Sequence, residues 1–146
     1  MRVDEYVRFD AVGLSDLVAS GEVTPGDLQH CAIEAVEKVQ PAVNAVAALH
    51  PRDDAELPSD GRLHGVPTLV KDLFHGQAGL PCGNGSRLAP DWVVPARSLL
   101  FSRVEAAGLN SIGRSTTSEF GIMGTTETTA CGATRSPIAP DRIDGG

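Results

Sequence analysis

The sequence predicts an α/β protein, because segments with helical spacing alternate with short apolar runs of strand length. In chain order, the expected elements are two helices, a strand, a surface loop, a second strand, an irregular loop, a third helix and a third strand. With 146 residues and 41% hydrophobic content, the chain is long enough for one domain with a core. We therefore treat residues 1–146 as parts of a single domain.

The N-terminal part predicts two helices. Residues 10–20 place their apolar side chains on one helical face, and a glycine follows directly. A stronger start signal comes next, with Thr24 as the N-cap, Pro25 in the first turn and Asp27 three residues after the cap. This second helix is expected to end at Pro41. Its inward face is expected to carry Leu28, Ile33, Val36 and Val39.

Three short apolar runs predict the strands, at residues 43–49, 66–71 and 109–113. Residues 75–95 are rich in glycine and proline and are expected to form an irregular loop. Residues 96–107 follow with helical spacing of Leu99, Leu100, Arg103 and Val104.

The C-terminal part shows no hydrophobic period. Thr117 is expected to cap a single turn at residues 118–120. Residues 121–146 are rich in Gly, Thr and Pro, and a structureless segment of this length is unusual in a compact domain. We expect it to be either a functional loop or a segment that lacks its normal support.

Composition excludes several classes of function. A net charge of −7 and a pI near 4.9 argue against nucleic acid as a partner. No run approaches the roughly 18 apolar residues of a membrane span, and the N-terminus is too polar for a signal peptide. Three widely spaced cysteines give no disulfide framework, so a cytoplasmic location is expected. The four histidines lack metal-ligand spacing, so no metal site is expected.

Lys71 is the most informative single residue. It ends the second apolar run and is one of only two lysines, against ten arginines. A buried ammonium is costly unless it is paired, and a desolvated, neutral lysine can act as a base. Local sequence alone favours a simpler interpretation, an exposed Lys71–Asp72 pair at a strand end, because perturbed lysines are rare outside functional sites.

Several motifs resemble the amidase signature family, in the same order as in that family. The resemblance runs from about residue 10 to residue 146. The matching motifs are Leu63-His64-Gly65-Val66-Pro67, Val70-Lys71-Asp72, Ile112-Gly113-Arg114-Ser115-Thr116, Glu119-Phe120-Gly121, Gly132-Ala133-Thr134-Arg135-Ser136-Pro137 and Asp144-Gly145-Gly146. Three positions depart from the usual pattern: Arg114 stands for a lysine, Ser136 for an asparagine and Asp144 for a residue that is often proline.

The resemblance implies the mixed-sheet fold of that family with flanking helices, of which this chain would be an N-terminal fragment. The family uses a Ser–cis-Ser–Lys triad, and Lys71 stands at the position of its lysine. Both serines would then lie beyond residue 146, so that the domain is truncated before the serine loops. The candidate substrate-binding residues are Gly121, Met123 and Gly124. We further expect Lys71 to be buried near the glycines at residues 145–146.

The expected activity is hydrolysis of a carboxamide C–N bond to an acid and an amine or ammonia, with Lys71 as the base and a small amide as the partner. The resemblance implies no metal or organic cofactor. One alternative is the amidase-like subunit of a tRNA-dependent amidotransferase, which needs partner subunits. Another is a fragment without catalytic activity, or an association module, that self-associates through unpaired strand edges.

Two cysteines offer a different nucleophile. An amidase of the nitrilase class would combine Cys82 or Cys131 with Lys71 and a glutamate such as Glu119. No histidine adjoins either cysteine in the sequence, and small buried or loop cysteines are the favoured interpretation. The glycine-rich run at residues 83–86 lacks the spacing of a phosphate-binding loop.

Overall fold

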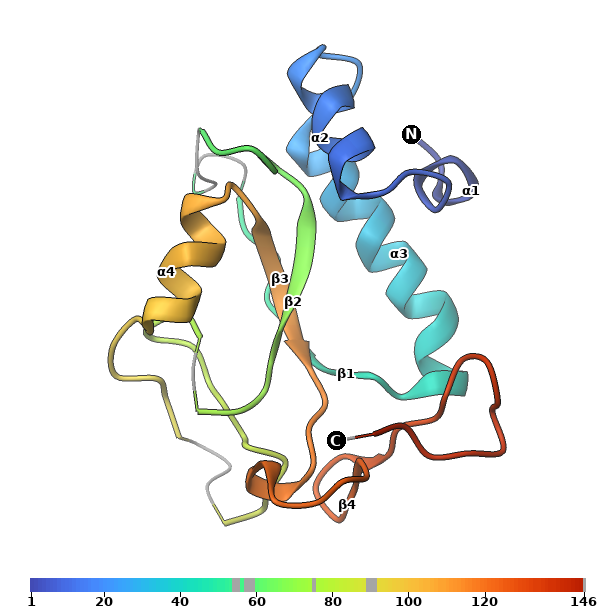
Figure 1. Ribbon diagram of the computed structural model, residues 1–146, viewed down its shortest axis with the longest axis vertical. Coiled ribbons are helices and arrows are strands. Elements are labelled where there is room, and N and C mark those ends of the chain that lie inside the picture. Colours follow the sequence, from blue (N-terminus) through green and yellow to red (C-terminus); the bar gives the residue numbers. More distant parts are fainter. Residues whose placement is uncertain (54–55, 57–59, 75, 89–91, 146) are drawn as a thin grey trace.

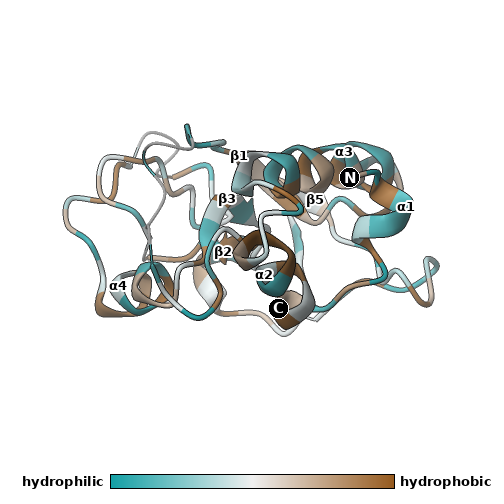
Figure 2. Ribbon diagram, turned by 90° about the horizontal axis from the view of Figure 1, so that it is seen from above, coloured by the Kyte–Doolittle hydropathy of each residue, from teal (hydrophilic) through white to brown (hydrophobic). Residues whose placement is uncertain are grey.

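The computed structural model describes residues 1–53, 56, 60–74, 76–88 and 92–145. A small sheet lies at its centre, with the long helix α3 on one side and the shorter α4 on the other (Figures 1 and 2). The elements are α1 (Val3–Tyr6), α2 (Ala11–Ala19), α3 (Pro25–Val43), β1 (Val46–Leu49), β2 (Pro67–Lys71), α4 (Leu99–Ala106), β3 (Asn110–Ser115), the 3₁₀ turn η2 (Glu119–Gly121), β4 (Glu127–Thr128) and β5 (Gly132–Ala133).

The sheet is mixed, which confirms the predicted α/β class. Its order is β1-β3-β2, with β1 antiparallel to β3 and β2 parallel to β3. The central strand β3 is buried along nearly its whole length, as expected for a strand paired on both sides. In the described part of the chain, β2 is therefore an edge strand.

The predicted start of α3 is confirmed. The hydroxyl of Thr24 accepts the Asp27 N–H at 3.1 Å, and the Asp27 carboxylate accepts the Thr24 N–H at 2.8 Å. This reciprocal capping box satisfies two backbone donors that a helix start leaves free. The Thr24 N–H and the Thr24 hydroxyl each donate to the Asp27 carboxylate at 2.8 Å, and these hydrogen bonds lower the pKa of Asp27.

The predicted end of α3 is wrong. The helix passes through Pro41 and ends at Val43, with Asn44 in the left-handed region at φ 51°. The side chain of Gln40 explains the extension, because its oxygen accepts the N–H groups of residues 45 and 46 and its amide donates to the carbonyl of residue 46. A proline in the last turn removes only one backbone donor, so the helix can continue.

The inward face of α3 also differs from the prediction. Leu28 is fully buried, but Val39 is 52% exposed, since it lies on the outer face of the C-terminal turns. Cys31 and Ala32 are buried in its place. The core beneath the two N-terminal helices is formed by Leu14, Leu28 and Val66, with Met1, Tyr6, Val18, Val23, Leu63 and Leu109 packed against it.

Replacing Thr24 with alanine should lower the free energy of unfolding by about 1 kcal/mol, because the cap bond to the Asp27 N–H is lost. Chemical denaturation of the two proteins measures the difference. Thr24→Ser keeps a hydroxyl at the same position and serves as the control. Equal stability of the alanine variant and the parent would show that the cap does not stabilise α3.

The helix predicted at residues 96–107 is shorter. It starts at Leu99 because the Ser98 hydroxyl caps the Phe101 N–H at 3.1 Å. Phe101 is its buried residue at 1% exposure, whereas Leu99 and Leu100 are exposed. Within the described ranges, no helix has both the length and the apolar character needed to cross a membrane.

The segment after β3 is more ordered than the sequence predicts. The single turn lies at Glu119–Gly121 and follows Ser118, so the expected cap at Thr117 is wrong. Thr117 is instead fully buried. Residues 121–145 contain the β4–β5 hairpin, and two isolated bridges, Thr125 with Gly145 and Arg135 with Ile143, tie the end of the chain to it.

Candidate active site

Lys71 lies at the C-terminal end of β2, in register with Ser115 of the parallel neighbour β3. It is half-buried rather than buried as predicted, because β2 is an edge strand and leaves one flank of the lysine uncovered. Among the described residues, its ammonium group makes no hydrogen bond and no ion pair, whereas the other lysine, Lys38, pairs with Glu34 at 2.7 Å. The lysine is thus available to a partner.

Asp72, the next residue, is buried at 5% exposure and points the other way. Both of its carboxylate oxygens accept the Gly83 N–H, at 3.0 and 3.1 Å, and one lies 3.8 Å from Nε of Arg114 on β3. The exposed Lys71–Asp72 pair considered from the sequence is therefore wrong. The Asp72 carboxylate instead contacts Arg114 of the neighbouring strand β3 and the Gly83 N–H of a distant loop.

The loop at residues 83–86 lies between the end of β2 and the turn η2 and is hydrogen-bonded to both. The side-chain oxygen of Asn84 accepts the Phe74 N–H at 2.7 Å, and its backbone carbonyl accepts the Phe120 N–H at 2.9 Å. The two phenylalanine rings stack with centroids 6.1 Å apart. The Ser86 hydroxyl donates to the Glu119 carboxylate at 2.6 Å. This glycine-rich run, which carries no functional prediction from the sequence, is what fixes the backbone beyond Lys71.

The candidate substrate residues lie just after this turn. Met123 is 62% exposed and lines an open pocket of about 210 Å³. Gly121 packs against Leu73, and Gly124 faces open space. The other residues around the pocket are Glu119, Thr125, Glu127, Thr128 and Thr129. The structure thus brings Met123 into a pocket with threonine and glutamate residues, but it leaves Gly121 and Gly124 outside the lining.

The two candidate cysteine nucleophiles differ in their surroundings. Cys82 is fully buried, and burial raises the pKa of its thiol, which disfavours the reactive thiolate. Cys131 is partly exposed, with its backbone carbonyl accepting the Asn44 amide at 2.7 Å. Within the described residues, Glu119 is hydrogen-bonded to Ser86 and not to either cysteine or to Lys71. No Glu–Lys–Cys arrangement is therefore assembled there.

A buried group of hydroxyls and an amide holds the C-terminal segment against the sheet. The hydroxyls of Thr116 and Thr134 are 2.8 Å apart, and that of Thr134 donates to the Asn44 carbonyl at 2.8 Å. Thr126 extends the group to the end of the chain, with its hydroxyl 3.3 Å from the Gly145 carbonyl. The contact expected between Lys71 and the terminal glycines stays a prediction, and Gly146 lies outside the described residues.

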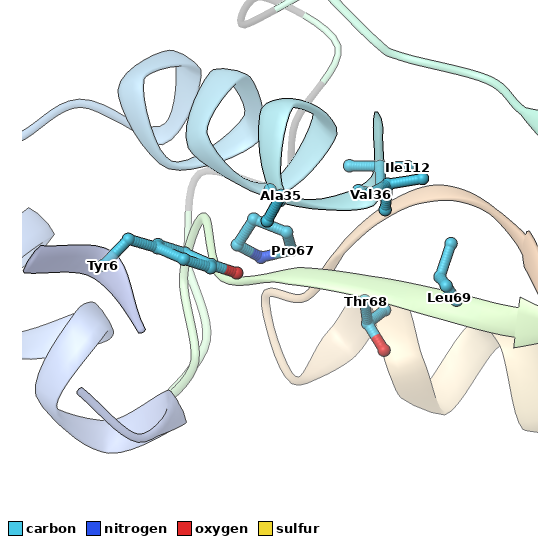
Figure 3. A pocket seen from close by; sticks show the side chains of 8 residues that line it. Tyr6, Ala35, Val36, Pro67, Thr68, Leu69 and Ile112 are labelled. Carbon is cyan, nitrogen blue, oxygen red and sulfur yellow. The ribbon is translucent and has the colours of Figure 1, made fainter. Parts of the chain in front are cut away.

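An apolar pocket of about 270 Å³ lies beside β2, on the side of the sheet covered by α3 (Figure 3). It is lined by Tyr6, Ala32, Ala35, Val36, Pro67, Thr68, Leu69 and Ile112. Its position next to the unpaired edge of the sheet shows where apolar surface is left open. No group of three or more His, Cys, Asp or Glu side chains that could hold a metal occurs in the described ranges.

His50, just after β1, lies close to the charged pair formed by Arg114 and Asp72. Burial and the charge of Arg114 lower the pKa of this histidine below its ordinary value of 6.5, although Asp72 opposes the shift. The unfolded chain therefore binds a proton more readily than the folded chain as the pH falls through about 6.5. The stability contributed by a neutral His50 is present above that pH and is lost below it.

Replacing His50 with glutamine should reduce the loss of stability between pH 7.5 and pH 5.5, values chosen to lie about one unit on either side of the free histidine pKa. The parent and the variant are unfolded in urea at both pH values, and the differences between the two midpoints are compared. His30→Gln on α3 is the matched control, since the charges near His30 are those of Asp27 and Glu34. An unchanged pH dependence in His50→Gln would contradict the assignment.

The fold and this site define a class: an α/β domain in which a mixed sheet presents, at a strand end, a lysine that has no partner among the residues the structure describes. A family model described as Amidase matches residues 30–146. The chain belongs to the amidase signature family.

Individual relatives agree with this assignment. The A subunit of the glutamyl-tRNA(Gln) amidotransferase of Mycobacterium tuberculosis (strain ATCC 25177 / H37Ra) is 29% identical over 154 aligned residues, covering 97% of this chain and 31% of the relative. A bacterial aryl acylamidase superposes with a TM-score of 0.86 at 29% identity, over 94% of this chain and 31% of that structure. The 6-aminohexanoate cyclic dimer hydrolase, solved with its substrate, superposes with a TM-score of 0.81 at 30% identity. The match covers 94% of this chain and 30% of that structure. The chain thus spans about a third of the length of these proteins.

Proposed function

We propose that this chain supplies the lysine base of an amidase that cleaves a carboxamide C–N bond to an acid and an amine or ammonia. The observation that carries the proposal is Lys71 itself, a half-buried lysine that has no partner among the described residues and lies at the C-terminal end of β2. The order of the motifs around Lys71 supports this role, in which a serine hydroxyl would be the partner of the lysine.

In the proposed mechanism, two serines come from sequence that this chain does not contain. One serine hydroxyl attacks the amide carbonyl, and its proton passes through the second serine to the neutral amine of Lys71. The lysine then returns the proton, through the second serine, to the departing nitrogen. Water hydrolyses the resulting acyl ester, which releases the acid and restores the serine. Backbone N–H groups of the serine loops would hold the oxyanion.

The pocket beside Met123 is the proposed binding place for part of the substrate. Its threonine hydroxyls and its two carboxylates, from Glu119 and Glu127, suit a polar or cationic group better than an extended alkyl chain. Gly121 and Gly124 would border it once the rest of the domain is present. The proposed partner is therefore a small amide that carries such a group.

The apolar pocket and the free edge of β2 are the proposed contact surface for the remainder of the amidase domain. The relatives are about three times as long as this chain, so about two thirds of their length has no counterpart here. Unpaired strand edges and open apolar surface favour association. Alone, this chain should be of marginal stability and prone to self-association through β2.

A second candidate function is the amidase-like subunit of a tRNA-dependent amidotransferase. The specific observation in its favour is the similarity to the A subunits of that class of enzyme, described above. Lys71 would keep the same role, and ammonia released from glutamine would pass to a partner. Turnover of glutamine only in the presence of partner subunits would select this function. For either function we propose a cytoplasmic location, since the three cysteines are free.

The experiment that tests the proposal compares this chain alone with a completed protein. In the completed protein, this chain replaces the aligned part of the bacterial aryl acylamidase, whose remaining sequence then supplies the serine loops. We expect turnover of simple aryl and aliphatic amides by the completed protein and none by the chain alone. A folded completed protein without turnover, or lysine-dependent turnover by the isolated chain, would contradict the proposal.

A further inference from the structure

We propose that Arg114 is a positioning residue for Lys71: it keeps the Asp72 carboxylate away from the lysine and fixes the backbone on which the lysine stands. This inference rests on the proposed function for its purpose. Its geometry is independent of that function, because it concerns a charged pair and a backbone amide that are all in the described chain. We call the three groups, Arg114, Asp72 and the Gly83 N–H, the aspartate clamp.

Both charged side chains of the aspartate clamp are buried. Arg114 is 4% exposed and Asp72 is 5% exposed, with 3.8 Å between the guanidinium Nε and the carboxylate. The Gly83 N–H supplies the other contact, at 3.0 and 3.1 Å from the two carboxylate oxygens. A carboxylate taken out of water at this depth is stable only while such partners remain. Asp72 is therefore held to one position.

The loop after β2 packs directly against the guanidinium group of Arg114 at Gly76. Gly76 has φ +146°, and a Cβ at this residue would lie 2.5 Å from Nη2 of Arg114. A small cavity of about 10 Å³, whose lining also includes His50 and Gln77, lies at the same place. Arg114 thus lies where β3, the end of β2 and the residue after β1 meet.

Strand geometry explains what the aspartate clamp does for Lys71. Neighbouring residues of a strand point to opposite faces, and Arg114 is in register with Val70, so Asp72 and Arg114 share the face that Lys71 does not occupy. An aspartate next to a lysine is its nearest available counter-charge. Because both Asp72 oxygens are engaged elsewhere, the lysine stays unpaired and remains free for a hydroxyl partner.

The test observes the Lys71 side chain directly by NMR and requires no catalytic activity. The chain has only two lysines, so labelling with lysine that carries carbon-13 at Cε gives two resolvable sets of signals, which Lys38→Arg assigns. In the parent, the two Hε protons of Lys71 should have different chemical shifts, as in an ordered side chain. In Asp72→Asn and in Arg114→Met, that difference should collapse or the signal should move, while Lys38 is unchanged.

Glu105→Gln is the matched control, because it removes the charge of another partly buried carboxylate, which lies on α4 and pairs with Arg97 at 2.9 Å and with Arg52 at 3.4 Å. It should leave both lysine signals unchanged. Arg114→Lys keeps the charge and should restore part of the Lys71 signal relative to Arg114→Met. A folded Asp72→Asn protein with the parent's Lys71 signal would overturn the proposal, and so would equal effects of Glu105→Gln and Asp72→Asn.

A measurement on the parent keeps the proposal testable if the variants fail to fold. The Gly83 amide should exchange with solvent as slowly as the amides between β2 and β3, because it is locked to Asp72. Rapid exchange of Gly83 beside slow exchange in the sheet would overturn the aspartate clamp. The failure of amide hydrolysis in the completed protein would contradict the proposed function and would leave these lysine spectra unaffected, so the two proposals fail separately.

Discussion

Replacing Lys71 with alanine in the completed protein should lower kcat/KM for amide hydrolysis by roughly 10³- to 10⁶-fold. A serine hydroxyl is a weak nucleophile until a base takes its proton, and the proposed mechanism has no other base. The loss should fall mainly on kcat, because the lysine acts on the proton and not on substrate binding. Steady-state kinetics with one aryl amide and one aliphatic amide measures both constants.

Lys38→Ala is the control for that result. Lys38 lies on α3 and is paired with Glu34, so its removal should leave kcat/KM unchanged. Circular dichroism and the unfolding midpoint must show that the Lys71→Ala protein is folded. Near-normal turnover by a folded Lys71→Ala protein would remove the lysine from the mechanism.

Replacing Gly113 with alanine should destabilise the chain by about 3 kcal/mol or more, enough to prevent cooperative folding of a marginal domain. Gly113 lies in β3, opposite Leu49 of β1. A Cβ there would overlap the backbone carbonyl oxygen of Ala48 and lie 3.0 Å from Cα of Leu49. Since these atoms belong to the backbone of a paired strand, relief requires that β1 move away from β3.

Gly124→Ala is the matched control, because no atom lies within 4 Å of the position where its Cβ would be built. Its stability should stay within about 0.5 kcal/mol of the parent. Urea unfolding of the three proteins under one set of conditions gives the comparison. A Gly113→Ala protein as stable as the control would show that the β1–β3 pairing is looser than described.

Local signals were sufficient for much of the fold. The capping residues Thr24 and Asp27 start a helix through hydrogen bonds between close neighbours, so the sequence predicts that start without knowledge of the rest. The apolar run that ends at Lys71 likewise predicts β2. The end of α3 is different, because the side chain of Gln40 overrides the usual effect of Pro41 by bonding to the following residues.

The parts that sequence did not predict depend on contacts between distant residues. Asp72 contacts Gly83 and Arg114, which are far from it in the sequence, so no helical or strand periodicity predicts these contacts. The C-terminal segment is ordered by side-chain bonds of Thr134 and Asn44 rather than by an apolar stripe, so its composition resembles that of a loop. The sequence marked Asp72 and Arg114 only as parts of family motifs, with no indication that the two side chains contact each other.

The most direct test of the proposed role of Lys71 is the experimental structure of the completed protein, determined with its serine loops in place. We expect Nζ of Lys71 to lie within hydrogen-bond reach, about 2.6–3.2 Å, of a serine hydroxyl from the added sequence. Asp72 should still be bound by Arg114 and the Gly83 N–H. A Lys71 amine that points into solvent with no serine within reach, or one that pairs with Asp72, would contradict the central claim that this chain supplies the base of an amidase.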